Sequence, residues 1–169
     1  MRQPFVAAAL AARYIPRGRP ILDAACGTGL AGEMLSVLGY DQLIGCDISS
    51  NMRDIAGKLG VYRQLIEADL AALPFPDHTF AGFVCCGAFG PGHAPPEALE
   101  ELVRVCEPGA VGVFTLREDT FRDQGFPVVM AALTERRQWH ILEETRPART
   151  YLLAEPKLFT RYFAVEITG

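Results

Sequence analysis

Short apolar runs and amphipathic stretches alternate along most of the chain. Runs rich in Val, Ile, Leu, Phe and Cys predict buried strands, whereas apolar residues that recur every three or four positions predict helices. We expect helices over residues 5–15, 30–38, 49–59, 95–106 and 126–137. Strands are expected over residues 21–23, 42–47, 62–68, 80–86, 111–116, 139–145 and 161–168. The alternation of the two kinds of element predicts an α/β fold.

The stretch around the first strand has the pattern of a nucleotide-binding corner. Residues 21–22 are apolar, Asp23 follows them, and a glycine-rich turn precedes the next helix. Small residues let a ligand approach the backbone, and the free N–H groups of the helix N-terminus face that ligand. Twenty positions after Gly27, a second apolar strand ends in Asp47, a spacing that suits a carboxylate binding ribose hydroxyls. These residues predict a cofactor of the adenosine type.

The same glycines allow a dinucleotide-binding interpretation. Residues 27–32 satisfy G-x-G-x-x-G, the pattern of many NAD-type oxidoreductases. Against it, the glycines begin several residues after the strand, and Asp23 would repel a pyrophosphate while suiting the cationic methionine end of S-adenosylmethionine. Such oxidoreductases also need a substrate domain, for which 169 residues leave little room.

Composition and charge restrict the partners of the chain. Its 169 residues, 50% apolar and 21% charged, are typical of one domain with its own core. A net charge of −4 gives no electrostatic reason to expect nucleic acid, and no apolar run approaches the roughly 20 residues that span a membrane. Five cysteines without a C-x-x-C pair indicate free thiols in a cytoplasmic protein and no metal site. We expect a monomer or homodimer that acts on a small molecule.

Three motifs resemble those of the class I S-adenosylmethionine-dependent methyltransferases. Residues 23–29, Asp-Ala-Ala-Cys-Gly-Thr-Gly, look like motif I of that family, with Ala25 where glycine is commonest. Asp69 follows the third strand, where the family binds the adenine amino group. Residues 102–109 resemble the family's L-x-R-V-x-K-P-G-G motif, with glutamate for lysine. Motif I and the region of Trp139 look most like the methyltransferase-like proteins of the Williams–Beuren critical-region type, within the methyltransferase domain 11/25 group.

The resemblance implies a fold, a cofactor and a set of site residues. The implied fold is a Rossmann-like, seven-stranded, mostly parallel sheet with helices on both faces, made of five strand–helix units and two final strands, the last antiparallel. Residues 1–169 would form a single domain that lacks the family's N-terminal lid over the cofactor. The cofactor would be S-adenosyl-L-methionine, bound by Asp23, Ala25, Cys26, Gly27, Thr28, Gly29, Asp47, Ile48, Met52, Asp69, Leu70 and Cys86.

Methyl transfer from a sulfonium depends on positioning the acceptor and excluding water rather than on a catalytic triad. If a base is needed, His93 is the candidate, because its glycine-rich loop follows the fourth strand, where an open α/β sheet has its crevice. The sequence therefore predicts a methyltransferase acting on an unidentified small-molecule acceptor. Two alternatives stay open: a non-catalytic S-adenosylmethionine-binding or scaffold protein, favoured by the short N-terminus, and, as a minor one, an NAD-type oxidoreductase.

Overall fold

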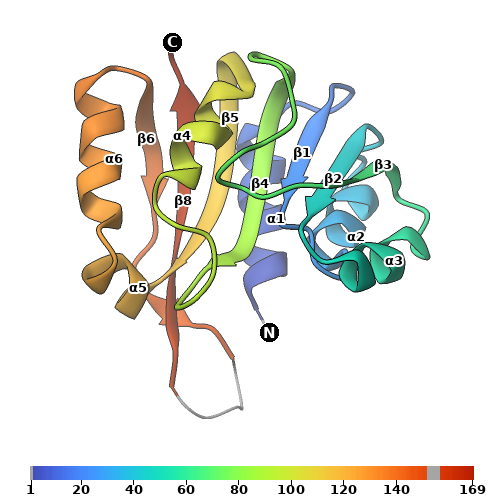
Figure 1. Ribbon diagram of the computed structural model, residues 1–169, viewed down its shortest axis with the longest axis horizontal. Helices are drawn as coiled ribbons and strands as arrows, with labels where there is room; N and C mark the ends of the chain where they lie inside the picture. Colours follow the sequence, from blue (N-terminus) through green and yellow to red (C-terminus); the bar gives the residue numbers. More distant parts are fainter. Residues whose placement is uncertain (1, 152–156) are drawn as a thin grey trace.

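The computed structural model describes residues 2–151 and 157–169, which form one sheet with helices on both faces (Figure 1). The strands are β1 (Ile21–Ala24), β2 (Leu43–Asp47), β3 (Tyr62–Glu67), β4 (Phe80–Phe89), β5 (Cys106–Arg117), β6 (Trp139–Glu144), β7 (Ala148–Arg149) and β8 (Phe159–Ile167). The helices are α1 (Gln3–Tyr14), α2 (Leu30–Val37), α3 (Ser50–Gly57), α4 (Ala98–Arg104), α5 (Glu118–Asp123) and α6 (Phe126–Glu135). Every predicted element is present with shifted ends, and α5 and β7 are additions to the prediction.

The sheet has the strand order β3-β2-β1-β4-β5-β8-β6, with β7 paired to β8 outside this path. Strands β1 to β5 run parallel to one another, whereas β8 runs antiparallel to β5, β6 and β7. The predicted Rossmann-like, mostly parallel sheet with an antiparallel last strand is thus confirmed, and the two-residue β7 makes the sheet eight-stranded. Because the chain reverses its order at β1, the carboxyl ends of β1 and β4 border the crevice where such folds bind ligands.

Two apolar layers hold the helices on the sheet. On one face, α1 and α2 pack on the central strands in a cluster that includes Ala7, Leu35 and Val84. On the opposite face, α4 and α6 cover a cluster that includes Phe114 and Leu133 (Figure 1).

Two strands extend beyond their predicted ends. β4 continues past residue 86 to Phe89, and β5 begins at Cys106, well before residue 111. The prediction that Cys106 lies on a helix face was therefore wrong. The N–H groups of Thr79 and Phe80 both donate to the carbonyl of Val105, at 2.8 and 3.0 Å. The chain thus joins the sheet directly after α4, ahead of the expected start of this strand at residue 111.

The connection from β3 to β4 contains no helix in the structure, so the prediction of five strand–helix units fails at the third unit. Residues 68–79 instead form a loop that α4 holds in place. The Arg104 guanidinium donates to the carbonyls of Phe75 (2.9 Å) and Leu73 (3.0 Å) and forms an ion pair with Glu101. Arginine presents several donors in one plane, so a single side chain satisfies loop carbonyls that a helix would have satisfied internally.

Candidate functional site

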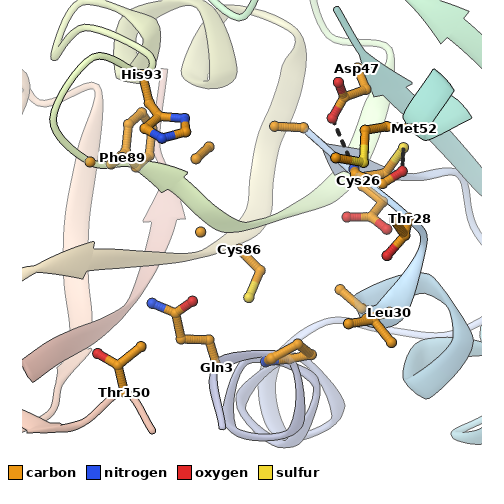
Figure 2. A pocket seen from close by; sticks show the side chains of 18 of the residues that line it. Gln3, Cys26, Thr28, Leu30, Asp47, Met52, Cys86, Phe89, His93 and Thr150 are labelled. Atoms are coloured by element: carbon orange, nitrogen blue, oxygen red, sulfur yellow. Dashed lines mark hydrogen bonds between the residues drawn. The ribbon is translucent and has the colours of Figure 1, made fainter. Parts of the chain in front are cut away.

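Two adjoining cavities open at the carboxyl edge of the parallel strands. The first, of about 530 Å³, is lined by the ends of β1 and β4, the start of α1 and the segment around Thr150 (Figure 2). The second, of about 360 Å³, is lined by the ends of β2 and β3 and the loop after β4. Ala25, Asp47, Ala88 and His93 line both. Volumes of about 300–1,000 Å³ are typical of small-molecule sites.

Asp47, the last residue of β2, organises the backbone between the two cavities. Its Oδ2 accepts a hydrogen bond from the N–H of Gly27, and its Oδ1 accepts one from the N–H of Ser49, each at 2.9 Å. An ionised carboxylate accepts up to about four hydrogen bonds, so acceptor capacity remains beside the cavities. The Ser49 hydroxyl accepts the N–H of Met52, so Ser49 caps α3 and fixes the helix next to the site.

The turn after β1 uses backbone conformations that favour glycine. Gly27, Gly29 and Ala25 have φ values of +55°, +88° and +54°. A Cβ on Gly27 would meet no atom within 4 Å, which leaves the cavity side of the turn open, whereas on Gly29 it would lie 2.6 Å from Cδ1 of Leu59. Gly27 therefore lets a ligand approach the backbone, and Gly29 lets α2 pack closely against the end of α3.

Replacing Ala25 with glycine should stabilise the protein slightly. Ala25 holds a left-handed conformation that disfavours an L side chain by roughly 1–2 kcal/mol, and the extra freedom of glycine in the unfolded chain offsets about 0.4–1 kcal/mol of that relief. We expect a gain of about 0.5 kcal/mol in the free energy of unfolding, measured by urea denaturation. The matched change Ala9→Gly, at an exposed position inside α1, should lose about 1 kcal/mol; a loss at both positions would contradict the argument.

Asp23 is a carboxylate buried in the wall of the first cavity. It lies in β1 with 1% of its surface exposed, and its Oδ2 accepts a hydrogen bond from the Tyr62 hydroxyl at 2.5 Å. Burial raises the pKa of Asp23 to about 7, and the nearby Asp47 adds to the rise, although hydrogen bonds from Tyr62 and the Gly32 backbone favour the ionised form. A buried carboxyl group whose pKa lies near 7 can ionise beside a cationic ligand group, so this part of the cavity wall suits a cation.

The structure brings together all but one of the residues predicted for the site. The first cavity is lined by Asp23, Ala25, Cys26, Gly27, Thr28, Asp47, Met52, Cys86 and His93, and the second also by Ile48, Asp69 and Leu70. Gly29 lines neither cavity, because its free side faces the end of α3 and not the ligand space. The sequence pattern of a binding turn contains both glycines and does not reveal which of them packs inward.

Most residues on the far side of the first cavity were missed by the sequence interpretation. They come from α1, from β5, and from the residues after β7 and just before β8, and include Gln3, Pro4, Arg117, Thr150, Tyr151 and Leu158. Gln3 and Thr160, whose side chains are hydrogen-bonded at 3.0 Å, are 157 positions apart. A contact between residues so far apart leaves no pattern in the local sequence. The one sequence feature that pointed to this side of the cavity was the glycine-rich loop after the fourth strand, which does border it.

His93 lies at the junction of the two cavities, on an exposed part of the loop after β4. Figure 2 shows it beside Phe89, across the cavity from Asp47 and Met52. The described part of the chain supplies no hydrogen bond that would orient its imidazole. The other two histidines interact elsewhere, His78 with the carbonyl of Cys106 and His140 with Glu166.

Cys86 lines the first cavity as a thiol. Burial raises its pKa to about 12, so it is protonated at neutral pH and a poor nucleophile. All five cysteines are free. Within residues 2–151 and 157–169, no three His, Cys, Asp or Glu side chains lie together as a metal site would require. None of the helices described here combines the length and apolarity of a membrane-crossing segment.

Comparison with known proteins finds methyltransferases. Residues 22–114 match the family model described as a methyltransferase domain. The chain is 37% identical over 107 residues to methyltransferase-like protein 27 of Homo sapiens, covering 62% of this chain and 43% of that protein. It is 33% identical over 92 residues to demethylmenaquinone methyltransferase of Paenarthrobacter aurescens (54% and 36% covered). It is 32% identical over 124 residues to the tRNA (carboxymethyluridine(34)-5-O)-methyltransferase of Arabidopsis thaliana (69% and 29% covered).

The chain spans less than half the length of each of these three relatives. Among solved structures, it resembles a TehB-like SAM-dependent methyltransferase from Corynebacterium glutamicum, with a TM-score of 0.71 and 22% identity over 96% of this chain and 87% of that chain. At 22% sequence identity, this likeness shows that the two proteins share a fold. It agrees with the sheet order and with the position of the cavities at the carboxyl ends of the strands.

Proposed function

This chain belongs to the methyltransferase domain family, whose model matches more than half of its residues, and on that premise we propose that it transfers a methyl group from S-adenosyl-L-methionine to a small, neutral acceptor. Membership implies S-adenosyl-L-methionine as the cofactor and replaces the oxidoreductase interpretation. We further propose that residues 1–169 act as one cofactor-binding domain in the cytoplasm, where free thiols stay reduced.

One observation carries the proposal: the Asp47 carboxylate lies where the two cavities join. A nucleoside with a charged amino-acid tail needs a base site, a sugar site and a tail site in that order. The second cavity, Asp47 and the part of the first cavity beside Asp23 supply three such sites in sequence. The remaining part of the first cavity, on the far side of His93 and Cys86, is then free for the acceptor.

The residues present fit the cofactor. Asp47 keeps acceptor capacity for ribose hydroxyls after taking two backbone N–H groups. Within the described residues, the side chain of Asp69 uses only Oδ1, for the N–H of Ala71 at 2.9 Å, so its second oxygen is available to an amino group. Ile48 is 68% exposed at the second cavity although it is apolar, and a bound base would cover it. Asp23 suits the cationic tail.

The bound cofactor would supply a methyl group on a sulfonium, which is transferred by in-line displacement. The protein would position the cofactor and the acceptor, exclude water from the site and supply charged side chains. Asp23 and Asp47 would orient the cofactor, and Phe89 and Cys86 would exclude water around the acceptor. His93 is the proposed group to take a proton from the acceptor, because its imidazole lies at the junction of the cavities.

A small acceptor is proposed although one relative's name includes tRNA. The net charge of the chain is −4, which disfavours a phosphate backbone. The cationic side chain Arg117 at the far side of the cavity is paired, with its Nε donating to Oδ1 of Asp119 at 3.1 Å. These features support a neutral molecule that the cavity encloses.

The proposed cofactor site is tested by calorimetric titration with S-adenosylhomocysteine. We expect the wild-type chain to bind and Asp47→Ala to bind about thirtyfold more weakly or worse, because each hydrogen bond to a charged acceptor contributes roughly 1.5–3 kcal/mol. The matched control Asp41→Ala removes an exposed carboxylate just before β2 and should leave the affinity unchanged.

Absence of binding by the wild-type chain would overturn the proposed function, as would equal binding by wild type and Asp47→Ala. Where binding is present, production of S-adenosylhomocysteine in the presence of small acceptors then separates the enzyme from the scaffold alternative. NADH should not compete with S-adenosylhomocysteine, and competition would favour the dinucleotide interpretation instead.

A further inference from the structure

The acceptor side of the first cavity is lined by Gln3, a largely buried side chain that presents its amide oxygen to the cavity. Gln3, the first residue of α1, is 5% exposed and lines this cavity. Its Nε2 donates to Oγ1 of Thr160 at 3.0 Å, whereas Oε1 has no hydrogen bond to the described part of the chain. Figure 2 shows the amide reaching from α1 into the space between Cys86 and Thr150. An amide oxygen that faces a cavity and has no protein partner is open to a hydrogen bond from a ligand or from water.

The amide of Gln3 is held from behind. Thr160 is fully buried, and its Oγ1 lies 2.7 Å from Oγ1 of Thr150, itself 3% exposed. The backbone at Thr150 is fixed as well, because its N–H donates to the carbonyl of Leu158 and its carbonyl accepts the N–H of Arg2. Three chain segments therefore hold one side chain, which directs Oε1 toward the cavity near Gly87, where an added Cβ would lie 3.4 Å from that oxygen.

The surroundings of this oxygen are otherwise apolar or neutral. Phe89, Leu158 and Pro4 line the same side of the cavity, and the charge of Arg117 is paired with Asp119. A firmly held hydrogen-bond acceptor beside these apolar side chains favours ligands that carry a matching donor, because a ligand without that donor leaves the oxygen desolvated and unpaired.

We propose that Gln3 is the specificity-determining residue of the acceptor site, and that the acceptor is a neutral, mainly apolar small molecule whose hydroxyl donates a hydrogen bond to Oε1 of Gln3. This inference rests on the proposed function, because it assigns a ligand to the half of the cavity that the cofactor leaves free. Gln3 binds and orients the acceptor; it takes no proton.

The test measures binding of matched probes to the chain saturated with S-adenosylhomocysteine, by ligand-observed NMR. The probes are phenol, benzyl alcohol and 1-naphthol, each paired with its methyl ether, which keeps the apolar body and loses the donor. We expect the hydroxyl member of at least one pair to bind the wild-type chain about fivefold tighter or more, since an unmade hydrogen bond leaves a buried acceptor unsatisfied.

Gln3→Met should abolish this discrimination and leave the affinity for S-adenosylhomocysteine within about twofold, because methionine keeps the length of the side chain but lacks the amide. Gln124→Met makes the same change at an exposed position between α5 and α6 and should keep the discrimination. Thr160→Val removes the hydroxyl that holds the amide, together with its bond to Thr150, so a reduced discrimination is expected there. This variant is the alternative test if Gln3→Met fails to fold.

Equal binding of hydroxyl compounds and ethers by the wild-type chain would overturn the proposal, and so would discrimination that survives Gln3→Met or, in its place, Thr160→Val. Binding of S-adenosylhomocysteine without binding of any probe also overturns it, and leaves the cofactor half of the proposed function standing. Failure to bind S-adenosylhomocysteine overturns the proposed function itself, and the role of Gln3 falls with it.

Discussion

Asp23→Asn should make the ligand-free protein more stable at pH 8 while weakening its binding of S-adenosylmethionine about a hundredfold. The buried carboxylate has a pKa of about 7 in the folded chain, against about 3.9 in an unfolded one. A pKa raised by this much corresponds to about 4 kcal/mol of destabilisation once the group is ionised. Asparagine keeps the shape and can still accept the Tyr62 hydroxyl bond, but it carries no charge for a cationic ligand.

The sign of the pH dependence follows from proton binding. Between about pH 4 and pH 7 the folded chain holds a proton on Asp23 that the unfolded chain has lost, so the free energy of unfolding falls as the pH rises through this window. Above the folded pKa of about 7 the contribution is constant. Asp23→Asn lacks this group, so the stability difference between variant and wild type should grow from near zero at pH 4 to about 4 kcal/mol at pH 8.

Urea denaturation of both proteins across this pH range checks the result. The difference between the two curves isolates Asp23 from other carboxylates, such as Glu118 and Asp119, whose pKa values arginine partners lower and whose effects lie at more acidic pH. A wild-type stability that tracks the variant at every pH would show that Asp23 is not a buried acid. Calorimetry with S-adenosylmethionine at pH 8 measures the predicted loss of binding.

Gly32→Ala should be the most damaging single-methyl change at the site. A Cβ on Gly32 would lie 2.1 Å from the Tyr62 hydroxyl oxygen and 2.4 Å from the ring carbon Cζ that bears it. The ring is closely confined, since Cβ atoms on Gly29 and Gly45 would lie 3.3 and 3.0 Å from it. Tyr62 must therefore shift and give up its bond to Asp23. Overpacking and a lost bond to a carboxylate together predict a destabilisation of about 3 kcal/mol or more.

The control for this variant is Gly57→Ala at the end of α3, where the nearest atom to an added Cβ is Cδ1 of Leu65 at 3.5 Å. Alanine in a helix is favoured over glycine by about 0.8–1 kcal/mol, so a small gain in stability is expected at this position. Thermal and urea unfolding of both variants, with S-adenosylhomocysteine binding as a second readout, compare them. An effect of equal sign at both glycines would contradict the packing argument.

The sequence was sufficient for the parts of the site that lie close together along the chain. Asp23, the turn containing Gly27 and the carboxylate of Asp47 follow consecutive strands, and parallel strands bring their carboxyl ends together. The antiparallel position of β8 followed from the family resemblance and is confirmed. These features depend on local pattern and on the general rules of α/β topology.

The parts that the sequence left out depend on contacts between distant segments. Tyr62 reaches Asp23 across 39 positions, and its side chain fits there only because Gly29 and Gly32 of the α2 region and Gly45 of β2 make room. Gln3 meets Thr160 across 157 positions. The sequence also did not predict that the connection before β4 lacks a helix. The loop carbonyls there are satisfied by the guanidinium of Arg104, which lies in α4 and is distant in sequence. Periodicity describes one element at a time and cannot report such pairings.

The hydrogen bond from Arg2 to the carbonyl of Thr150 has a practical consequence for handling the protein. The first described residues lie at the cavity, at the edge of the sheet opposite the last ones (Figure 1). An affinity tag fused ahead of Gln3 would therefore crowd the binding site and compete with ligands, whereas a tag after Gly169 projects from the far edge. Purification through the carboxyl end, or complete removal of an amino-terminal tag, is the appropriate starting point for every binding experiment on this chain.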